Sequence, residues 1–293
     1  MPNLKEVRNR IESVKSTQQI TSAMKLVAAS KLRKAQNAIM SLRPYSKKMS
    51  EILQNVSASI DSDGNSVYGQ QRPEEKILIV ALASNRGLCG AFNSNVIKLT
   101  RRLIFNTFAP QHAKGNVHLI CAGKHLSDYF VRQNFGLHGR FDAIFDKPEY
   151  QAVADIATGI MKAFESKKYD AVYLVYNQFK NAATQTLITE QFLPIAPSKE
   201  KTATHSADYI FQPDKNEILD DLVPRSLKIQ LYKAVLDSFA SEQGARMTAM
   251  HQATDNAKEI LRQLKLAYNK ARQNAITSEI LEIVGGANAL KSS

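Results

Sequence analysis

Two long stretches that carry a narrow apolar stripe, one at each end of the 293-residue chain, constrain the fold more than any other feature. In residues 3–60, apolar side chains recur at spacings of three and four, which predicts a helix. A stripe this narrow is typical of a coiled-coil seam. At 1.5 Å per residue the helix would be about 85 Å long, so we expect it to extend beyond a small domain. The expected seam comprises Leu4, Val7, Ile11, Val14, Ile20, Met24, Val27, Leu32, Ala35, Ile39, Leu42, Tyr45, Met49, Ile52, Val56 and Ile60.

Two local signals refine this first helix. Asn3 and Glu6 have the spacing of a capping box, which predicts the helix start. Pro44 removes one backbone hydrogen bond, at a cost of about 3 kcal/mol. Because the apolar period continues beyond Pro44, we expect a kink there and no end of the helix.

The second stretch lies near the C-terminus. Pro224 fits the first turn of a helix, and Gly285-Gly286 fits its end, so the pattern predicts a helix over 224–284. Each seam is most simply buried against the other, which removes both from water. We therefore expect residues 1–60 and 224–293 to form an antiparallel coiled coil. The expected second seam comprises Leu227, Leu231, Val235, Phe239, Ala253, Ala257, Ile260, Leu264, Ala267, Ala271, Ile276, Ile280 and Ile283.

The segment between the long helices alternates strand and helix signals. Residues 61–73 are polar and turn-rich, which indicates a linker. The alternation that follows predicts an open α/β sheet within residues 74–223. Strands are expected at 76–84, 116–123 and 169–179, with an antiparallel edge strand at 186–196, and helices at 93–106, 124–134 and 150–166.

Charge is concentrated at the two ends of the chain. Residues 1–48 have a net charge of +9, residues 49–224 one of −1 and residues 225–293 one of +4. The basic ends therefore predict an acidic partner. Lys25, Lys31, Arg33 and Lys34 lie around an Ala-rich helical turn. Positions 31, 33 and 34 face different directions on a helix, so that positive charge would encircle it. These residues are either a solvated basic surface or a grip for acidic loops. Residues 275–290 carry only Glu279 and Glu282 as charges among many apolar groups, which indicates a tip that needs a partner.

Motifs for catalysis or cofactor binding are absent from the sequence. The stretch SNRGLCGAFN (84–93) follows a strand, but it has neither the dinucleotide nor the P-loop glycine pattern. No Asp or Glu occurs over residues 76–127, where a ribose-binding acid would be expected. We interpret it as a structural turn and expect no catalytic, cofactor or metal site. Cys89 and Cys121 are too few for a disulfide framework and fit a reducing cytoplasm. We also find no run of 18 apolar residues and no secretory signal.

Six stretches of this sequence resemble the bacterial F-type ATP synthase γ subunit family. They are KLVAASKLRKAQ (25–36), RGLCGAFN (86–93), EQGARMTAM (242–250), ATDNA (253–257), YNKARQNAIT (268–277) and EIVGGANAL (282–290). The resemblance implies an antiparallel coiled coil with a Rossmann-like domain at its base. It implies a central-stalk rotor inside a ring of three α and three β subunits, in contact with the ε subunit and the membrane c-ring. Such a rotor transmits torque between proton-driven rotation and ATP synthesis or hydrolysis, and the chemistry belongs to the β subunits. The cysteine-bearing regulatory insert of the chloroplast type is not present.

The resemblance also implies a place and a set of contact residues. The place is the cytoplasmic face of the bacterial inner membrane. The chain would not insert into lipid, and it would bind neither nucleic acid nor a cofactor. Lys31, Arg33 and Lys34 would face an acidic loop of the β subunit. The family's contact and coupling positions against the β subunits match Met24, Lys25, Arg246, Arg272, Gln273 and Thr277.

Two other functions are compatible with parts of the pattern. A nucleic-acid-binding coiled coil would use the basic helices, although residues 1–44 contain no aromatic side chain for base stacking. Its signature would be tight, salt-dependent binding of DNA or RNA. A nucleotide-dependent enzyme would use the α/β domain, and equilibrium dialysis with ATP or NAD would identify it.

Overall fold

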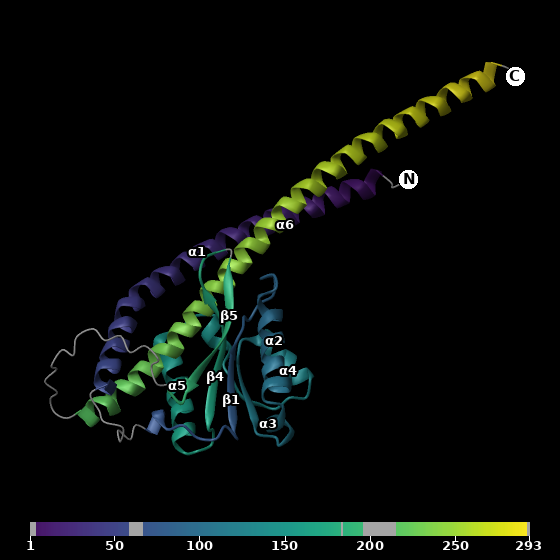
Figure 1. The fold of residues 1–293 in the computed structure, drawn as a ribbon. Helices are drawn as coiled ribbons and strands as arrows, with labels where there is room; N and C mark the ends of the chain where they lie inside the picture. Colours follow the sequence, from purple (N-terminus) through teal and green to yellow (C-terminus); the bar gives the residue numbers. More distant parts are fainter. Residues whose placement is uncertain (1–3, 59–66, 183, 196–214, 292–293) are drawn as a thin grey trace. The chain divides into compact units, whose positions relative to one another are not determined.

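The structure is a computed structural model that describes residues 4–58, 67–182, 184–195 and 215–291 (Figure 1). The chain forms two compact units. We call residues 1–27 together with 247–293 the helix pair, and residues 28–246 the sheet unit. The long helices α1 (Leu4–Ala58) and α6 (Lys215–Lys291) each contribute to both units.

A five-stranded mixed sheet forms the centre of the sheet unit. Its order is β3-β2-β1-β4-β5, with every pair parallel except β4 and β5. This order is that of a Rossmann sheet with an antiparallel edge strand, which confirms the predicted fold class. The strands are β1 (Ile77–Leu82), β2 (Val117–Ala122), β3 (Leu137–Arg140), β4 (Ala171–Phe179) and β5 (Gln185–Leu193). Strand β3 was not predicted, because its sequence LHGR holds a single large apolar residue.

Helices cover both faces of the sheet. Figure 1 shows α2 (Phe92–Arg102), α3 (Ala109–Ala113) and α4 (Lys124–Arg132) on one side and α5 (Tyr150–Glu165) on the other. Alternate residues of β1 serve the two faces, because side chains of a strand alternate. Those on the α2 side join one core cluster, which includes Val96 of α2 and Phe130 of α4. The expected helix over 93–106 changes to a π-helix at Leu103–Thr107.

One stretch of α6 inside the sheet unit is buried on all sides. Every residue from Ala234 to Gly244 is buried, and a helix that is covered all round belongs to the core. The Ser241 hydroxyl donates to the carbonyl of Asn177 on β4 at 3.1 Å. A Cβ on Gly244 would lie 3.1 Å from the carbonyl oxygen of Ala182, so glycine permits the close approach. The core of the unit therefore includes α6 as well as the sheet.

Helix α6 is longer than predicted at both ends. It begins at Lys215, nine residues before Pro224, and it continues through Gly285-Gly286 to Lys291. The prediction that Pro224 starts the helix and that the two glycines end it was wrong. An interior proline costs about 3 kcal/mol and a glycine about 1 kcal/mol, and a long helix can absorb both. Neither glycine adopts the positive φ that an end of the predicted type requires.

In the helix pair, the seam follows strict three–four spacing through polar residues. On α1 it contains Leu4, Val7, Ile11, Val14, Gln18 and Thr21, and on α6 Met250, Thr254, Ala257, Leu261, Leu264, Tyr268 and Ala271. The hydroxyl oxygens of Thr21 and Thr254 lie 2.9 Å apart across it. The prediction wrongly placed Ile20, Val27 and Ile260 in the seam, since they are 56%, 57% and 46% exposed. Residues three or four positions apart share one face of a helix, and Ile20 does not lie on the face that carries Val14.

Five further seam positions were also wrong. Tyr45 is exposed, and so is Ala267. Ile276, Ile280 and Ile283 are exposed as well, because they lie beyond the last seam residue, Ala271. In Figure 1 the C-terminal end of α6 runs past the N-terminal end of α1.

Several expectations fall outside the described residues. They concern the Asn3 cap, Ile60, residues 61–66 of the linker and the side chains of Ile52 and Val56. Val67–Gly69 of the linker forms a 3-10 turn. Helix α1 continues through Pro44 as expected. The expected division into residues 1–60 with 224–293 and residues 74–223 stays a prediction.

Candidate interaction surfaces

Met24 and Lys25 lie half-buried on α1 in the helix pair. The Lys25 ammonium nitrogen is 3.4 Å from Nδ1 of His251 on α6, and this Nδ1 is 3.3 Å from an Asp255 carboxylate oxygen. The neighbouring side chains leave an open groove of about 490 Å³. The structure therefore links a predicted contact residue of α1 to α6 through a polar chain, at the place where the seam itself turns polar.

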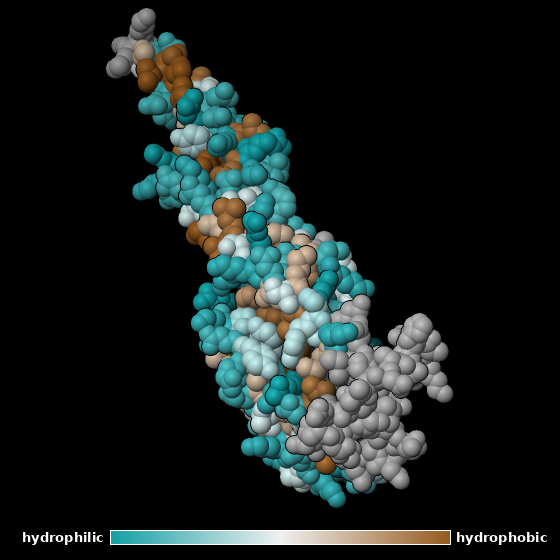
Figure 2. All heavy atoms as spheres, turned by 90° about the vertical axis from the view of Figure 1, so that its left-hand side faces the viewer, coloured by the Kyte–Doolittle hydropathy of each residue, from teal (hydrophilic) through white to brown (hydrophobic). Residues whose placement is uncertain are grey.

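Arg272, Gln273 and Thr277 are all exposed on the end of α6. The Thr277 hydroxyl donates to the backbone carbonyl of Gln273 at 2.9 Å, so it is satisfied within the helix. Ile276, Ile280, Leu281, Ile283 and Val284 are exposed beside them. Figure 2 shows apolar side chains next to the grey residues at this end of α6. The predicted contact residues thus share their helix end with an uncovered apolar surface.

Lys31, Arg33 and Lys34 are exposed on α1 in the sheet unit. Leu32 and Ala35 between and beside them are buried. The expectation that positive charge encircles the helix was wrong, because one side of this turn packs into the unit. The three cations instead form one exposed basic surface.

Arg246 is buried, and its guanidinium donates hydrogen bonds to other groups of the chain. One guanidinium nitrogen donates to the carbonyl of Gly87. The other donates to the carbonyl of Arg86 at 3.1 Å and to the Glu242 carboxylate at 2.6 Å. Arg86 and Gly87 belong to a turn formed by residues 86–90, which we call the 86–90 turn. Sequence reasoning missed Glu242, although its spacing of four from Arg246 is that of a helical ion pair.

The 86–90 turn follows β1 at the edge of the sheet where Rossmann folds hold phosphate. Here the carbonyl oxygens of Arg86 and Gly87 point at a guanidinium, and Ser84 also donates to the Arg86 carbonyl at 2.7 Å. Carbonyl oxygens repel phosphate, so this geometry favours the structural interpretation of the turn. Within it, Leu88 adopts a φ of +63° and is 66% exposed.

Both cysteines are buried, Cys89 within the 86–90 turn and Cys121 on β2. Burial raises the pKa of the Cys89 thiol, and hydrogen bonding by Ser84 partly opposes this. Burial also raises the pKa of Cys121 to about 12. Thiolates are the reactive form, so both thiols are poorly reactive in the folded chain.

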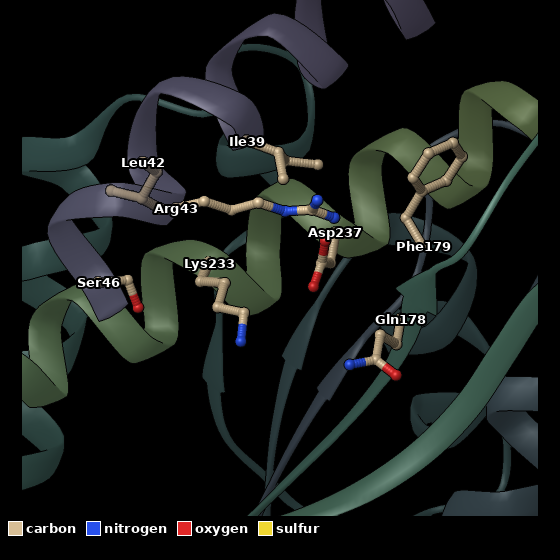
Figure 3. Close-up of a pocket in the computed structure, with 8 residues that line it drawn as sticks. All are labelled: Ile39, Leu42, Arg43, Ser46, Gln178, Phe179, Lys233 and Asp237. Atoms are coloured by element: carbon tan, nitrogen blue, oxygen red, sulfur yellow. The ribbon is translucent and has the colours of Figure 1, made fainter. Parts of the chain in front are cut away.

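A cavity of about 380 Å³ lies in the sheet unit between α1, α6 and the end of β4 (Figure 3). Its lining includes the side chains of Arg43, Lys233 and Asp237. Burial raises the pKa of Asp237 to about 6, with Glu190 adding to the effect and Lys233 and Arg43 opposing it. No ion pair joins Asp237 to Arg43 or Lys233.

Among the described residues, no group of three or more His, Cys, Asp or Glu side chains is placed to hold a metal ion. Among the described helices, none combines the length and the apolar character needed to cross a bilayer.

Comparisons with known proteins agree with the resemblance. The family model described as ATP synthase matches residues 3–290. A protein of Flavobacterium johnsoniae named ATP synthase gamma chain is 56% identical over 291 residues, which cover 99% of each chain. A protein of Cytophaga hutchinsonii with the same name is 48% identical over 295 residues and all of both chains.

Solved structures share the fold at lower identity. A chain of the Euglena gracilis mitochondrial ATP synthase in rotational state 3 matches with a TM-score of 0.68 and 20% identity. The match covers 98% of this chain and 94% of that one. A chain of the Tetrahymena thermophila mitochondrial ATP synthase central stalk and c-ring structure matches with a TM-score of 0.58 and 24% identity. It covers 80% of this chain and 99% of that one.

Proposed function

This chain belongs to the ATP synthase gamma chain family, and on that premise we propose that it is the central-stalk rotor subunit of a bacterial F-type ATP synthase. It transmits torque between proton-driven rotation of the c-ring and ATP synthesis or hydrolysis at the β subunits. The observation that carries this proposal is the family match over 3–290, because it includes the helix pair and the sheet unit together.

The physical properties of the helix pair support a mechanical role. A rotor must pass torque without unwinding, and two helices packed along a seam resist twisting better than one. Ala257 and Ala271 in the α6 seam let the two backbones approach closely. The exposed end of α6 carries mainly apolar groups, and apolar contacts are non-directional, so this end can turn in a socket without locking.

The partners in this proposal are the α and β subunits of the catalytic ring, the ε subunit and the membrane c-ring. The chain lies at the cytoplasmic face of the inner membrane as a peripheral subunit. It is not catalytic itself, which is supported by the internal occupancy of the 86–90 turn. Met24, Lys25, Arg272, Gln273 and Thr277 are the proposed contacts of the helix pair.

Affinity purification of the tagged full chain from its own cells tests the proposal. We expect recovery of three α and three β subunits per chain, with the ε subunit, and of the c-ring when the membrane is solubilised gently. Recovery of the chain alone, or with DNA or RNA, would contradict the proposal.

Replacing Lys31, Arg33 and Lys34 together by Gln is expected to lower proton-driven ATP synthesis about two- to tenfold. Each screened surface pair is worth up to about 1 kcal/mol, and an acidic loop would lose three of them. ATP synthesis is measured in proteoliposomes that contain the assembled complex. The matched control replaces Lys98, Lys114 and Lys162, which are exposed elsewhere on the sheet unit, and it should leave synthesis unchanged. Equal losses in both variants would refute a specific basic contact.

A further inference from the structure

The Glu242–Arg246 ion pair is buried, and pairing does not fully offset the cost of removing its charges from water. The Glu242 side chain is 6% exposed and the Arg246 side chain 10%. Burial raises the pKa of Glu242 although Arg246 and Lys31 oppose the shift. Buried ion pairs contribute little net stability, and apolar residues of similar size often serve as well. The pair therefore needs an explanation other than the stability of α6.

What the pair holds is the backbone of an exposed turn. The guanidinium of Arg246 binds two consecutive carbonyl oxygens, those of Arg86 and Gly87, while Glu242 fixes its orientation. A planar guanidinium presents several donors in a rigid fork, which an ammonium group cannot reproduce. The arrangement therefore fastens the 86–90 turn to α6 in one position.

The turn itself is strained and presents side chains to the outside. The left-handed conformation is unfavourable for a leucine, and Leu88 recovers little of this cost by burial, since it is 66% exposed. Arg86 is exposed as well. The base of the turn is held by Ser84, whose backbone N–H and hydroxyl lie 3.0 and 2.9 Å from the side-chain oxygen of Asn93. Strained, exposed and firmly held segments are typical of functional contacts.

We infer that Arg246 and Glu242 are positioning residues that fix the 86–90 turn on α6, so that the turn follows every movement of this helix, and that this fixed position is required for coupling. The inference rests on the proposed function. It assigns Arg246 an indirect role, in place of a direct contact with a partner subunit.

The test uses Arg246→Gln and Arg246→Lys in the full chain and in the assembled complex. Maleimide labelling of Cys89, identified by mass spectrometry of its peptide, reports on the turn, because Cys89 is one of its residues and is only 1% exposed. Labelling of the free chain is expected to rise about tenfold or more in Arg246→Gln and by a smaller factor in Arg246→Lys, because opening of the turn exposes the thiol. The ratio of proton-driven ATP synthesis to ATP hydrolysis in the complex should fall in the same order.

Arg262→Gln is the matched control. Arg262 also forms an ion pair with a glutamate of α6, at 2.8 Å from Glu259, but the pair is exposed and touches no turn. Neither the labelling of Cys89 nor coupling should change in this variant.

Each other outcome overturns the inference. If coupling falls in Arg246→Gln while Cys89 labelling stays at the wild-type level, Arg246 acts by direct contact. If labelling rises while coupling is kept, the position of the turn is irrelevant. If Arg246→Lys couples like the wild type although its labelling rises, only the charge matters. The labelling result does not depend on assembly, whereas failure of the wild-type chain to assemble would refute the proposed function instead.

Discussion

Ala257→Asp is expected to separate α1 from α6 in the helix pair and to abolish proton-driven ATP synthesis. Ala257 is 5% exposed and lies in the α6 seam one turn after Thr254. An aspartate there would bring a carboxylate into a close-packed seam, at a cost of several kcal/mol if it stays charged and unpaired. Synthesis in proteoliposomes should drop at least a hundredfold. Circular dichroism of the free chain should show loss of helix, with the sheet unit still folded.

Asn256→Asp is the control for this variant, because residue 256 is exposed on the same helix and receives the same charge. It should assemble and synthesise ATP at the wild-type rate. Full activity of Ala257→Asp would show that the two helices do not need to pack at this seam. The proposed mechanism of torque transmission would then fail.

Gly123→Ala is expected to destabilise the sheet unit by about 4 kcal/mol or more, a size reserved for severe steric or packing faults. Gly123 follows β2 with a φ of +114°, and a Cβ there would lie 2.1 Å from the carbonyl oxygen of Ala83. The methyl group cannot be accommodated unless the backbone after β1 moves. Denaturant unfolding of the purified chain, followed by tyrosine fluorescence, measures the change in free energy.

Gly115→Ala separates the steric effect from the backbone conformation. Gly115 also has a positive φ, +73°, but nothing lies within 4 Å of the position of its Cβ. This variant should lose only the cost of a left-handed alanine, about 1–2 kcal/mol. Similar losses in both variants would rule out the clash with Ala83 as the cause.

The sheet was predictable because its strands carry strong local signals. β1 is an unbroken run of buried apolar residues, ILIVAL, which is typical of a central parallel strand. β3 has no such signal, since the chain forms it only by pairing with β2. The order of the strands in the sheet cannot be derived from such local signals. It agrees with the Rossmann-like domain that the resemblance implied.

The seam was harder to predict because geometry, and not hydrophobicity, decides which residues face inward. The prediction chose Ile20 and Ile260 because they are apolar. The regular spacing of three and four instead places Gln18, Thr21 and Leu261 in the seam. Thr21 and Thr254 can occupy the seam because their hydroxyls meet there, a long-range contact that no local pattern shows. For the same reason, sequence reasoning identified Arg246 but not the turn that it holds, which lies some 160 residues earlier in the chain.

The exposed end of α6 has a thermodynamic consequence for assembly. From Arg272 to Asn288, the described residues are all exposed. Burial of Ile276, Ile280 and Ile283 in a surrounding subunit would not first require their removal from packing within the chain. The free energy of transfer from water, about 25 cal/mol per Å² of apolar surface, is then opposed mainly by the entropy of ordering the side chains and the partner. A subunit that covered this end would therefore gain the free energy of apolar burial without any prior loss of packing within the chain.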